Sequence, residues 1–477
     1  MGVVLAALSP HPPIIVPEIG KEEGQKAHQT QEALAGLARR IAGLEPDVLV
    51  LCDPHGEFSR HGITVHQTPI LEGDFGQFGY PDLAFRWPSH QKLANRIADG
   101  AREAGLPVVG REREQGELSY AAMVPLYYLR EAGVTAPLVS ITLGRADHMD
   151  YFRLGRVVRE SLEDLKLRGV VIASGDLSHR LKPGAPAGYD PAGKDFDALV
   201  VEAMREADGR RLLRIDPRLE ARAGYCGLDP LCLAMGSVEA LHPRGEVLSY
   251  EGPFGVGYAV AAFTPAVAEA RGEGSGEPAD EPKAAAREHG TGFLPVGMTE
   301  PDDIGCASEV TGLARQSLEA YVREGRIIPA PAQPGPCLRG RAGVFVTLHE
   351  YGVLRGCIGT IAPTRDSIAE EIIYNAIAAG TQDPRFRPVT RGELADLTYS
   401  VDILSPMERV DGLGDLDPRR YGVLVRKGRR QGLLLPDLEG IDTAEEQVAI
   451  AKDKAGIPRT DEDVELYRFT VERYEEP

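Results

Sequence analysis

Three histidines each follow a short and continuously apolar run of residues, and this pattern constrains the fold more than composition does. Residues 3–8 precede His11, residues 48–52 precede His55, and residues 170–173 precede His179. Short runs without polar alternation are typical of buried strands in α/β sheets. Ligands of such sheets bind in the crevice beyond the carboxyl ends of the strands. The pattern therefore predicts an α/β fold in which three imidazoles meet at one edge of a sheet.

An imidazole cluster at a sheet edge indicates a metal site or an acid–base site. Two histidines and a third donor, with coordination positions left open, form the usual site for iron(II) in oxygen chemistry. His11 stands between two prolines and His55 follows one, so the backbone is restricted at both positions. The alternative is a surface or hydrogen-bonded histidine at each position, and the residues alone leave it open.

Charge and length exclude several classes of function. The 477 residues are 43% hydrophobic and 26% charged, as expected for a globular protein with two or more domains. The net charge of -19 argues against binding to nucleic acid or to anionic membranes. We expect no transmembrane helix and no signal peptide, because no apolar stretch is long enough and the first residues enter a strand-like run. Six cysteines without a CxxC pair predict reduced thiols in a cytoplasmic protein.

The chain divides at a segment rich in glycine, proline and charge. Residues 268–292 have this linker composition and no apolar periodicity. Before them, residues 1–267 alternate strand-like and helical patterns, which predicts an α/β domain with a mostly parallel or mixed sheet flanked by helices. After them, residues 293–477 mix hairpins with separate helices, which predicts an α+β domain.

Two helix starts in the first domain carry capping residues. A helix is predicted over 120–131 with Ser119 as its N-cap, and another over 151–168 with Asp150 as its N-cap. Serine and aspartate suit this position because their side chains accept a hydrogen bond from the first free backbone amides.

The motifs around the three histidines resemble those of a known superfamily. Ser-Pro-His-Pro-Pro, Asp-Pro-His-Gly and Gly-Asp-Leu-Ser-His, in this order, are similar to the class III extradiol ring-cleavage dioxygenases, which are LigB-like, and to the related Memo proteins. The resemblance covers about residues 1–265. It implies that His11 and His55 are metal ligands and that His179 is the acid–base residue that faces substrate and oxygen.

The third metal ligand differs from the dioxygenase pattern. The dioxygenases use a glutamate, whereas the segment Ala-Gly-Tyr-Cys-Gly-Leu-Asp here resembles the Memo segment and offers Cys226. A thiolate shifts the preference toward copper(I) or zinc, and activated oxygen oxidises it readily. Glu220 and Glu239 are the alternative carboxylates, and the other interpretation of Cys226 is a small buried residue before a turn.

The remaining histidines carry weaker signals. His61 and His66 fall in a strand-like stretch and point to different faces of it. One of them is a candidate to orient a metal ligand through a hydrogen bond without binding the metal itself. The others lack a convergent context and are interpreted as structural: His90, His148, His242, His289 and His349.

A second motif lies in the carboxyl-terminal part. Leu-Arg-Gly-Cys-Ile-Gly-Thr at 354–360 resembles the signature of the AMMECR family, and the resemblance extends over 293–477. Arg355 is a candidate cation for an anionic ligand and Cys357 a candidate nucleophile. The alternative is a folding signature with a buried thiol. Since the two families and a radical-SAM enzyme are associated in bacteria and archaea, the fusion implies a radical-SAM protein as partner.

Two hypotheses about function follow, and whether the protein is an enzyme stays open between them. In the first, a metal-dependent oxidoreductase-like protein holds iron(II), or copper or zinc, and His179 moves protons for the cleavage of a catechol-type diol. In the second, the protein is a non-catalytic metal-binding scaffold or metallochaperone that works with the radical-SAM partner. Substrate, physiological metal and oligomeric state do not follow from the sequence.

Overall fold

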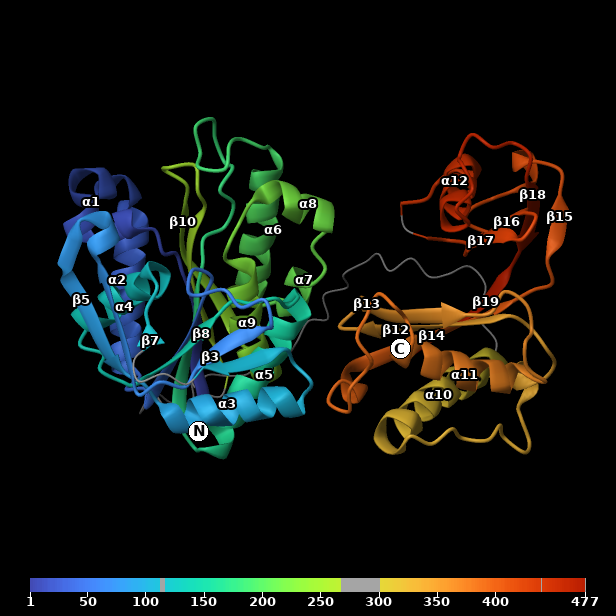
Figure 1. Ribbon diagram of the computed structural model, residues 1–477, viewed down its shortest axis with the longest axis horizontal. Helices are drawn as coiled ribbons and strands as arrows, with labels where there is room; N and C mark the ends of the chain where they lie inside the picture. Colours follow the sequence, from blue (N-terminus) through green and yellow to red (C-terminus); the bar gives the residue numbers. More distant parts are fainter. Residues whose placement is uncertain (112–115, 267–300, 439, 477) are drawn as a thin grey trace, which may run out of the picture. The chain divides into compact units, whose positions relative to one another are not determined.

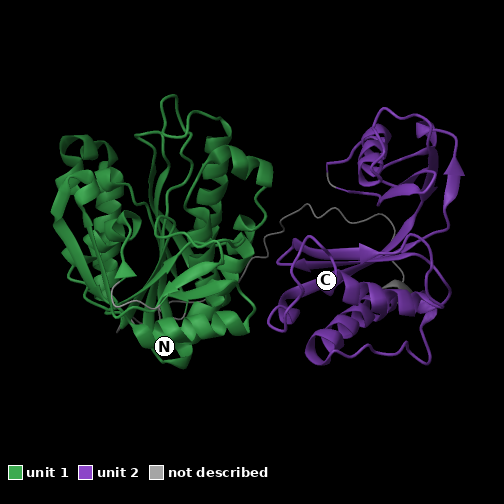
Figure 2. Ribbon diagram, in the orientation of Figure 1, with its two compact units in different colours: residues 1–283 green, residues 284–477 purple. Residues whose placement is uncertain are grey.

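The chain forms two compact units in the computed structural model, which describes residues 1–111, 116–266, 301–438 and 440–476. The first unit is Met1–Lys283 and the second is Ala284–Pro477 (Figure 2). The predicted linker 268–292, with His289 inside it, lies outside the described residues.

A large mixed sheet forms the centre of the first unit, as the alternating pattern predicts. Four central strands are mutually parallel. Two antiparallel pairs add two strands on one side, and on the other side an antiparallel pair and then a parallel pair add two more. The order across the sheet is β10 (Arg244–Glu251), β11 (Tyr258–Thr264), β1 (Gly2–Ser9), β9 (Arg168–Ser174), β2 (Val48–Asp53), β8 (Leu138–Thr142), β3 (Ile63–His66) and β6 (Val108–Arg111).

Helices cover both faces of this sheet (Figure 1). Helices α2 and α4 pack on one face, and α5 and α9 pack on the other. The helices of this unit are α1 (Pro17–Gly24), α2 (His28–Gly43), α3 (Gln91–Glu103), α4 (Tyr120–Glu131), α5 (His148–Asp164), α6 (Ala192–Glu206), α7 (Gly209–Leu212), α8 (Pro217–Ala223) and α9 (Leu228–Val238).

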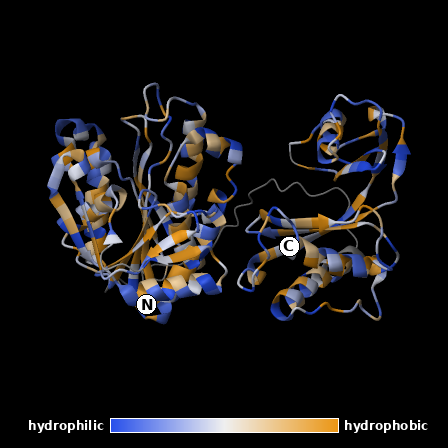
Figure 3. Cartoon of the chain, in the orientation of Figure 1, coloured by the Kyte–Doolittle hydropathy of each residue, from blue (hydrophilic) through white to orange (hydrophobic). Residues whose placement is uncertain are grey.

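The central strands are buried on both faces, which explains their uninterrupted apolar sequence. Alternate side chains of β1, β2 and β9 belong to the core shared with α2 and α4, and they are Leu5, Ala7, Leu49, Leu51, Val170 and Ile172. Figure 3 shows the corresponding concentration of hydrophobic residues in the strands and of hydrophilic ones on the outer helix surfaces. Beside the large sheet, β5 (Tyr80–Pro88), β4 (Ile70–Phe75) and β7 (Gly116–Glu117) form a smaller one in that order.

The two predicted N-caps have different outcomes. Ser119 caps α4 through a hydrogen bond from the amide of Ala122, as predicted. The prediction of Asp150 as the cap of a helix starting at residue 151 is wrong, because α5 begins at His148 and its cap is Asp147. Asp150 occupies the third helical position and accepts from the backbone of Asp147, which completes a capping box.

The second unit has the α+β architecture that the hairpin pattern predicts. One antiparallel sheet has the order β13 (Val353–Gly359), β12 (Val344–Glu350), β14 (Leu397–Leu404) and β19 (Val471–Glu475). The other has the order β15 (Glu408–Val410), β18 (Glu465–Phe469), β16 (Gly422–Lys427) and β17 (Arg430–Leu434). Helices α10 (Pro301–Glu324) and α11 (Ile368–Thr381) pack on the first sheet, and α12 (Ala444–Lys454) packs on the second.

Two of the six cysteines correct the expectation of reduced thiols throughout. Cys306 in α10 and Cys337 form a disulfide, with 5.9 Å between their Cα atoms. The remaining cysteines are free, and among them Cys52 and Cys232 are buried while Cys226 and Cys357 are half-buried. In the described part of the chain, none of the helices combines the length and apolarity needed to span a membrane.

Candidate metal centre

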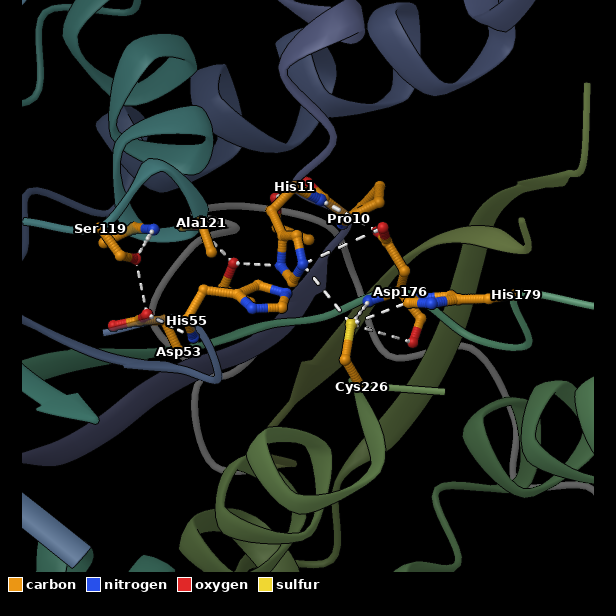
Figure 4. Close-up of polar contacts among 12 residues, drawn as sticks. Pro10, His11, Asp53, His55, Ser119, Ala121, Asp176, His179 and Cys226 are labelled. Atoms are coloured by element: carbon orange, nitrogen blue, oxygen red, sulfur yellow. Dashed lines mark hydrogen bonds and ion pairs between the residues drawn. The ribbon is translucent and has the colours of Figure 1, made fainter. Parts of the chain in front are cut away.

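Neighbouring parallel strands bring the three predicted histidines to one edge of the sheet. Strand β9 lies between β1 and β2 and is parallel to both. His11 follows β1, His55 follows β2 and His179 follows β9, so all three lie beyond carboxyl ends of strands (Figure 4). The strand order therefore explains how residues far apart in sequence meet at one place.

His11 is buried and its ring is held in one orientation. The hydroxyl of Ser174 donates to the carbonyl of Ala121 at 2.6 Å, so it accepts at 3.0 Å from Nδ1 of His11. This contact fixes the proton of His11 on Nδ1 and leaves the lone pair of Nε2 directed toward the site. The backbone amide of His11 donates to Oδ1 of Asp176 at 3.1 Å.

The turn after β2 holds His55 next to His11. Asp53 accepts hydrogen bonds from the amides of His55 and Gly56 and from the hydroxyl of Ser119. The ring of Tyr120 stacks on the ring of His55, with 5.0 Å between centroids. The rings of His55 and His11 meet edge to face with centroids 4.9 Å apart. Asp53 and Tyr120 thus restrict both the backbone and the ring of His55.

Cys226 completes the cluster from the loop between α8 and α9. Its Sγ lies 3.5 Å from Nε2 of His11 and 3.6 Å from Nε2 of His179 (Figure 4). The carbonyl of Asp176 accepts from the amides of Cys226 and Gly227, and the amide of Asp176 donates to Sγ at 3.4 Å. This loop and the segment after β9 therefore hold each other in place.

The close approach of these two segments requires glycine. A Cβ atom on Gly175 would lie 2.2 Å from the Cα of Gly227, inside the distance that any side chain tolerates. Two facing glycines thus set the distance between Asp176 and Cys226.

The donor atoms fit a metal ion in number and in chemistry. The donors of His11, His55 and Cys226 lie within 4.8 Å of one another, and so do those of Asp176, His179 and Cys226. Imidazole nitrogen and thiolate sulfur suit iron, copper and zinc, whereas magnesium and calcium prefer oxygen. Metal-binding histidines commonly donate a hydrogen bond from the ring nitrogen that does not face the metal, and Nδ1 of His11 makes such a bond to Ser174.

The environment favours neutral donors before a metal binds. Burial, and next the proximity of His55, lowers the pKa of both His11 and His179, and burial lowers the pKa of His55. Burial and the neighbouring Asp176 raise the pKa of the Cys226 thiol. Burial also raises the pKa of Asp176 to about 7, although the amide of His11 opposes the shift. A metal cation would therefore replace at least the thiol proton.

Sequence reasoning missed two residues of this site. Asp176, whose Oδ2 lies 3.9 Å from Nε2 of His11, belongs to the same Gly-Asp-Leu-Ser-His motif as His179. Its position three residues before His179 in a post-strand loop was the available signal. Tyr120 follows the predicted cap Ser119, but nothing in the sequence indicates that its ring stacks on His55.

The alternative carboxylates contact other parts of the unit. Glu220 pairs with the ring of His148 at 3.2 Å, and Glu239 pairs with Arg210 at 2.5 Å. Neither belongs to a candidate donor group in the described structure, and Asp176 takes that place. The interpretation of His148 as lacking a convergent context is wrong, because Nδ1 also contacts Asp229 at 2.5 Å.

His61 and His66 differ in burial. His61 is exposed, whereas His66 at the end of β3 is buried and its Nε2 lies 3.0 Å from the hydroxyl of Thr142. Neither ring belongs to a candidate donor group of the described residues. His90 has a structural role, because its Nδ1 accepts from the amide of Leu93 at the start of α3.

The motif of the second unit forms an internal network. Nε of Arg355 donates to Glu393 at 2.7 Å, so this buried guanidinium already has a carboxylate partner. Sγ of Cys357 accepts from Thr347 at 3.2 Å, and burial raises the pKa of this thiol. Neither observation indicates an activated nucleophile, and ligand binding at Arg355 and Cys357 stays a prediction.

Comparison with protein families agrees with the resemblance drawn from the motifs. Residues 5–261 match the family described as the catalytic LigB subunit of aromatic ring-opening dioxygenase. The chain belongs to the LigB family. Residues 311–474 match the AMMECR1 family, so this LigB protein also carries an AMMECR1 domain, and the order of the two fits the Memo-like fusion.

Relatives of this LigB protein include a chain that matches it almost throughout and shorter chains that match about a third of it. A protein of Clostridium acetobutylicum is 36% identical over 98% of both chains. A protein of Thermotoga maritima is 60% identical over 33% of this chain and 91% of its own. The crystal structure of an uncharacterized protein from Pyrococcus horikoshii has 37% identity and a TM-score of 0.34, and it covers 36% of this chain and 92% of that one.

Proposed function

We propose that His11, His55 and Cys226 hold a metal ion and that the LigB domain is a metal-dependent oxidoreductase acting on a catechol-type diol. The convergence of the three donor atoms within 4.8 Å carries this proposal. Iron(II) is the metal that two imidazoles in this family favour, and copper and zinc are the alternatives that a thiolate favours. Bound there, iron would supply Lewis acidity and redox chemistry for ring opening.

His179 is the proposed proton carrier. Because burial lowers its pKa, its imidazole is neutral near pH 7 and Nε2 accepts a proton from a diol hydroxyl. The protonated ring then returns this proton to the product. Nε2 lies beside Cys226 Sγ, so the group that moves the proton faces the same space as the metal donors.

A cavity beside the site offers space for a small aromatic molecule. Its volume is about 940 Å³, and His55, Ser119 and Tyr120 are among its lining residues. A ring that entered this cavity would approach the metal donors along the aromatic surface of Tyr120. The cavity therefore supports a small-molecule substrate.

The thiol of Cys226 favours a second candidate function, a metal-binding scaffold or metallochaperone. Asp176, His179 and Cys226 form a donor group in addition to the first one, so the site is able to surround a metal more fully than catalysis requires. In this role the AMMECR1 domain would dock a radical-SAM partner.

Anaerobic metal analysis tests the metal site common to both functions. We expect about one iron, copper or zinc ion per wild-type chain, and a strong loss of metal in His11→Ala, His55→Ala and Cys226→Ser. His61→Ala and Cys357→Ser are matched controls outside the site and should keep the wild-type content. Equal metal content in all five variants would remove the proposal.

Oxygen consumption separates the two functions. Iron-loaded protein that consumes oxygen with a panel of catechols supports the oxidoreductase. Uptake at the background level with stoichiometric iron present supports the scaffold.

A further inference from the structure

The cavity beside His55 is walled by the small sheet and is acidic. Strands β4, β5 and β7 contribute three carboxylates to its lining, Glu72, Asp74 and Glu117, and a single guanidinium, Arg86. The formal charge of these four side chains is therefore -2. Clefts lined by one sign of charge concentrate ligands of the opposite sign.

The basic residue of this cavity is already neutralised. Nε of Arg86 donates to Oε1 of Glu72 at 2.7 Å. Asp74 accepts from the amide of Gly76, and in the described part of the chain neither Asp74 nor Glu117 pairs with a basic side chain. Among the described residues, an anionic ligand would therefore meet two carboxylates without a basic partner and one guanidinium that is already paired with Glu72.

A smaller adjoining cavity repeats this arrangement. Its volume is about 320 Å³, and it shares His55, Glu117 and Ser119 with the larger one. Its basic residue, Arg111, donates to Glu57 at 2.7 Å. Glu117 therefore lies where the two cavities meet, close to the candidate metal donor His55.

Aromatic surface lies next to these carboxylates. Tyr120 lines the larger cavity, and Phe78 meets the ring of Tyr120 edge to face with centroids 5.5 Å apart. Phe85 lines the cavity as well, but the guanidinium of Arg130 already lies 4.3 Å from the centroid of its ring. Aromatic faces attract ammonium groups through their π electrons, and nearby carboxylates add to this attraction. The combination suits a ring that bears an amine better than a ring that bears a carboxylate.

We infer that this cleft selects a small aromatic ligand with a positively charged amine and rejects its carboxylate analogue. The inference rests on the proposed function, since it names the substrate class of the same site. Asp74 and Glu117 determine the selectivity, and the diol end of the ligand lies toward His55.

Three catechols with side chains of similar size test this selectivity on zinc-loaded protein, which does not turn over oxygen. They are 3,4-dihydroxybenzylamine, neutral 4-ethylcatechol and 3,4-dihydroxyphenylacetate, with dissociation constants measured by calorimetry at low salt. We expect the amine to bind about tenfold more tightly than the acid, with the neutral compound between them. Glu117→Gln and Asp74→Asn should each reduce the ratio about threefold, whereas the exposed control Glu32→Gln should leave it unchanged. Equal affinity for amine and acid, or a preference for the acid, would overturn the inference.

A second arm keeps the inference separate from the metal site. Benzylamine and phenylacetate lack the diol, so their binding to metal-free protein, measured by ligand-observed NMR, does not depend on a metal. If the protein prefers benzylamine and Glu117→Gln weakens this preference, the charge selectivity is supported even when no metal binds. In that case only the proposed function fails. Stoichiometric metal without any preference in either arm refutes the inference and leaves the metal site standing.

Discussion

Cys226 is the residue at which this LigB protein departs from the dioxygenases that it resembles, whose third ligand is a glutamate. Desolvation and Asp176 raise the pKa of the Cys226 thiol, so it holds its proton at neutral pH, whereas a carboxylate in water does not. If Cys226 is a ligand, as proposed, a thiolate in place of the carboxylate changes both the preferred metal and the pH at which the site binds it.

Metal affinity should fall as the pH falls. The histidines are already neutral near pH 7, since burial lowers the pKa values of His11 and His55, so the thiol proton is the one that binding displaces. We expect release of about one proton per metal at pH 7 and an affinity that rises about tenfold per pH unit. Calorimetry in buffers of different ionisation enthalpy measures the protons. Cys226→Ser should release none. If the wild-type protein releases more than one proton and Asp176→Asn abolishes the excess, Asp176 is also a ligand.

His179→Ala separates proton transfer from metal binding. If His179 carries protons, the variant should keep its metal and lose turnover by about a hundredfold or more. Metal titrations of His179→Ala and His55→Ala, compared with oxygen uptake, give the answer. A loss of metal affinity in His179→Ala as large as that in His55→Ala would instead make His179 a ligand in a closed site.

At the scale of elements, His148 joins three helices around the Cys226 loop. It is the first residue of α5, and its ring contacts Glu220 in α8 and Asp229 in α9, which flank Cys226. Burial opposes the charged ring, but the hydrogen bonds to Asp229 and Glu220 outweigh it and raise the pKa of His148 to about 10.

The contribution of His148 to stability should depend on pH. Because its folded pKa is raised above the ordinary 6.5, the stabilisation is complete below about pH 6.5 and is lost as the pH rises through about 10. We expect His148→Gln to lower the free energy of unfolding by about 2 kcal/mol at pH 6 and by far less at pH 10. Denaturant unfolding at the two pH values measures this difference, and an equal cost at both would show that the ring stays uncharged.

The sequence predicted the strands, and the residues that meet beyond their ends, better than it predicted contacts between elements. The apolar runs before His11, His55 and His179 identify strands because both faces of those strands are buried. The strand order was not accessible, since pairing β9 between β1 and β2 depends on contacts over long separations. The contacts of His148 were missed for the same reason, because Glu220 and Asp229 lie on helices that approach α5 only in the folded unit.

At the scale of the whole molecule, composition predicts that the two units fold independently. Residues 268–292 contain the tryptic sites Arg271, Lys283 and Arg287 in a segment without apolar periodicity. We expect limited trypsin digestion to cut there first and to release two fragments that melt separately. Mass spectrometry of the fragments and calorimetry check this, and earlier cleavage within 1–265 would indicate one tightly docked assembly.

The position of β9 between β1 and β2 also determines when the site forms during synthesis. Ser9 pairs with Ser174, so the strands that carry His11 and His55 become neighbours of β9 only after the ribosome has made residue 174. Cys226 emerges later still. A growing chain therefore presents its histidines one at a time and far apart, and it gains high affinity for a metal only when the amino-terminal unit is nearly complete. At the proposed metal site, loading would therefore follow the folding of this unit.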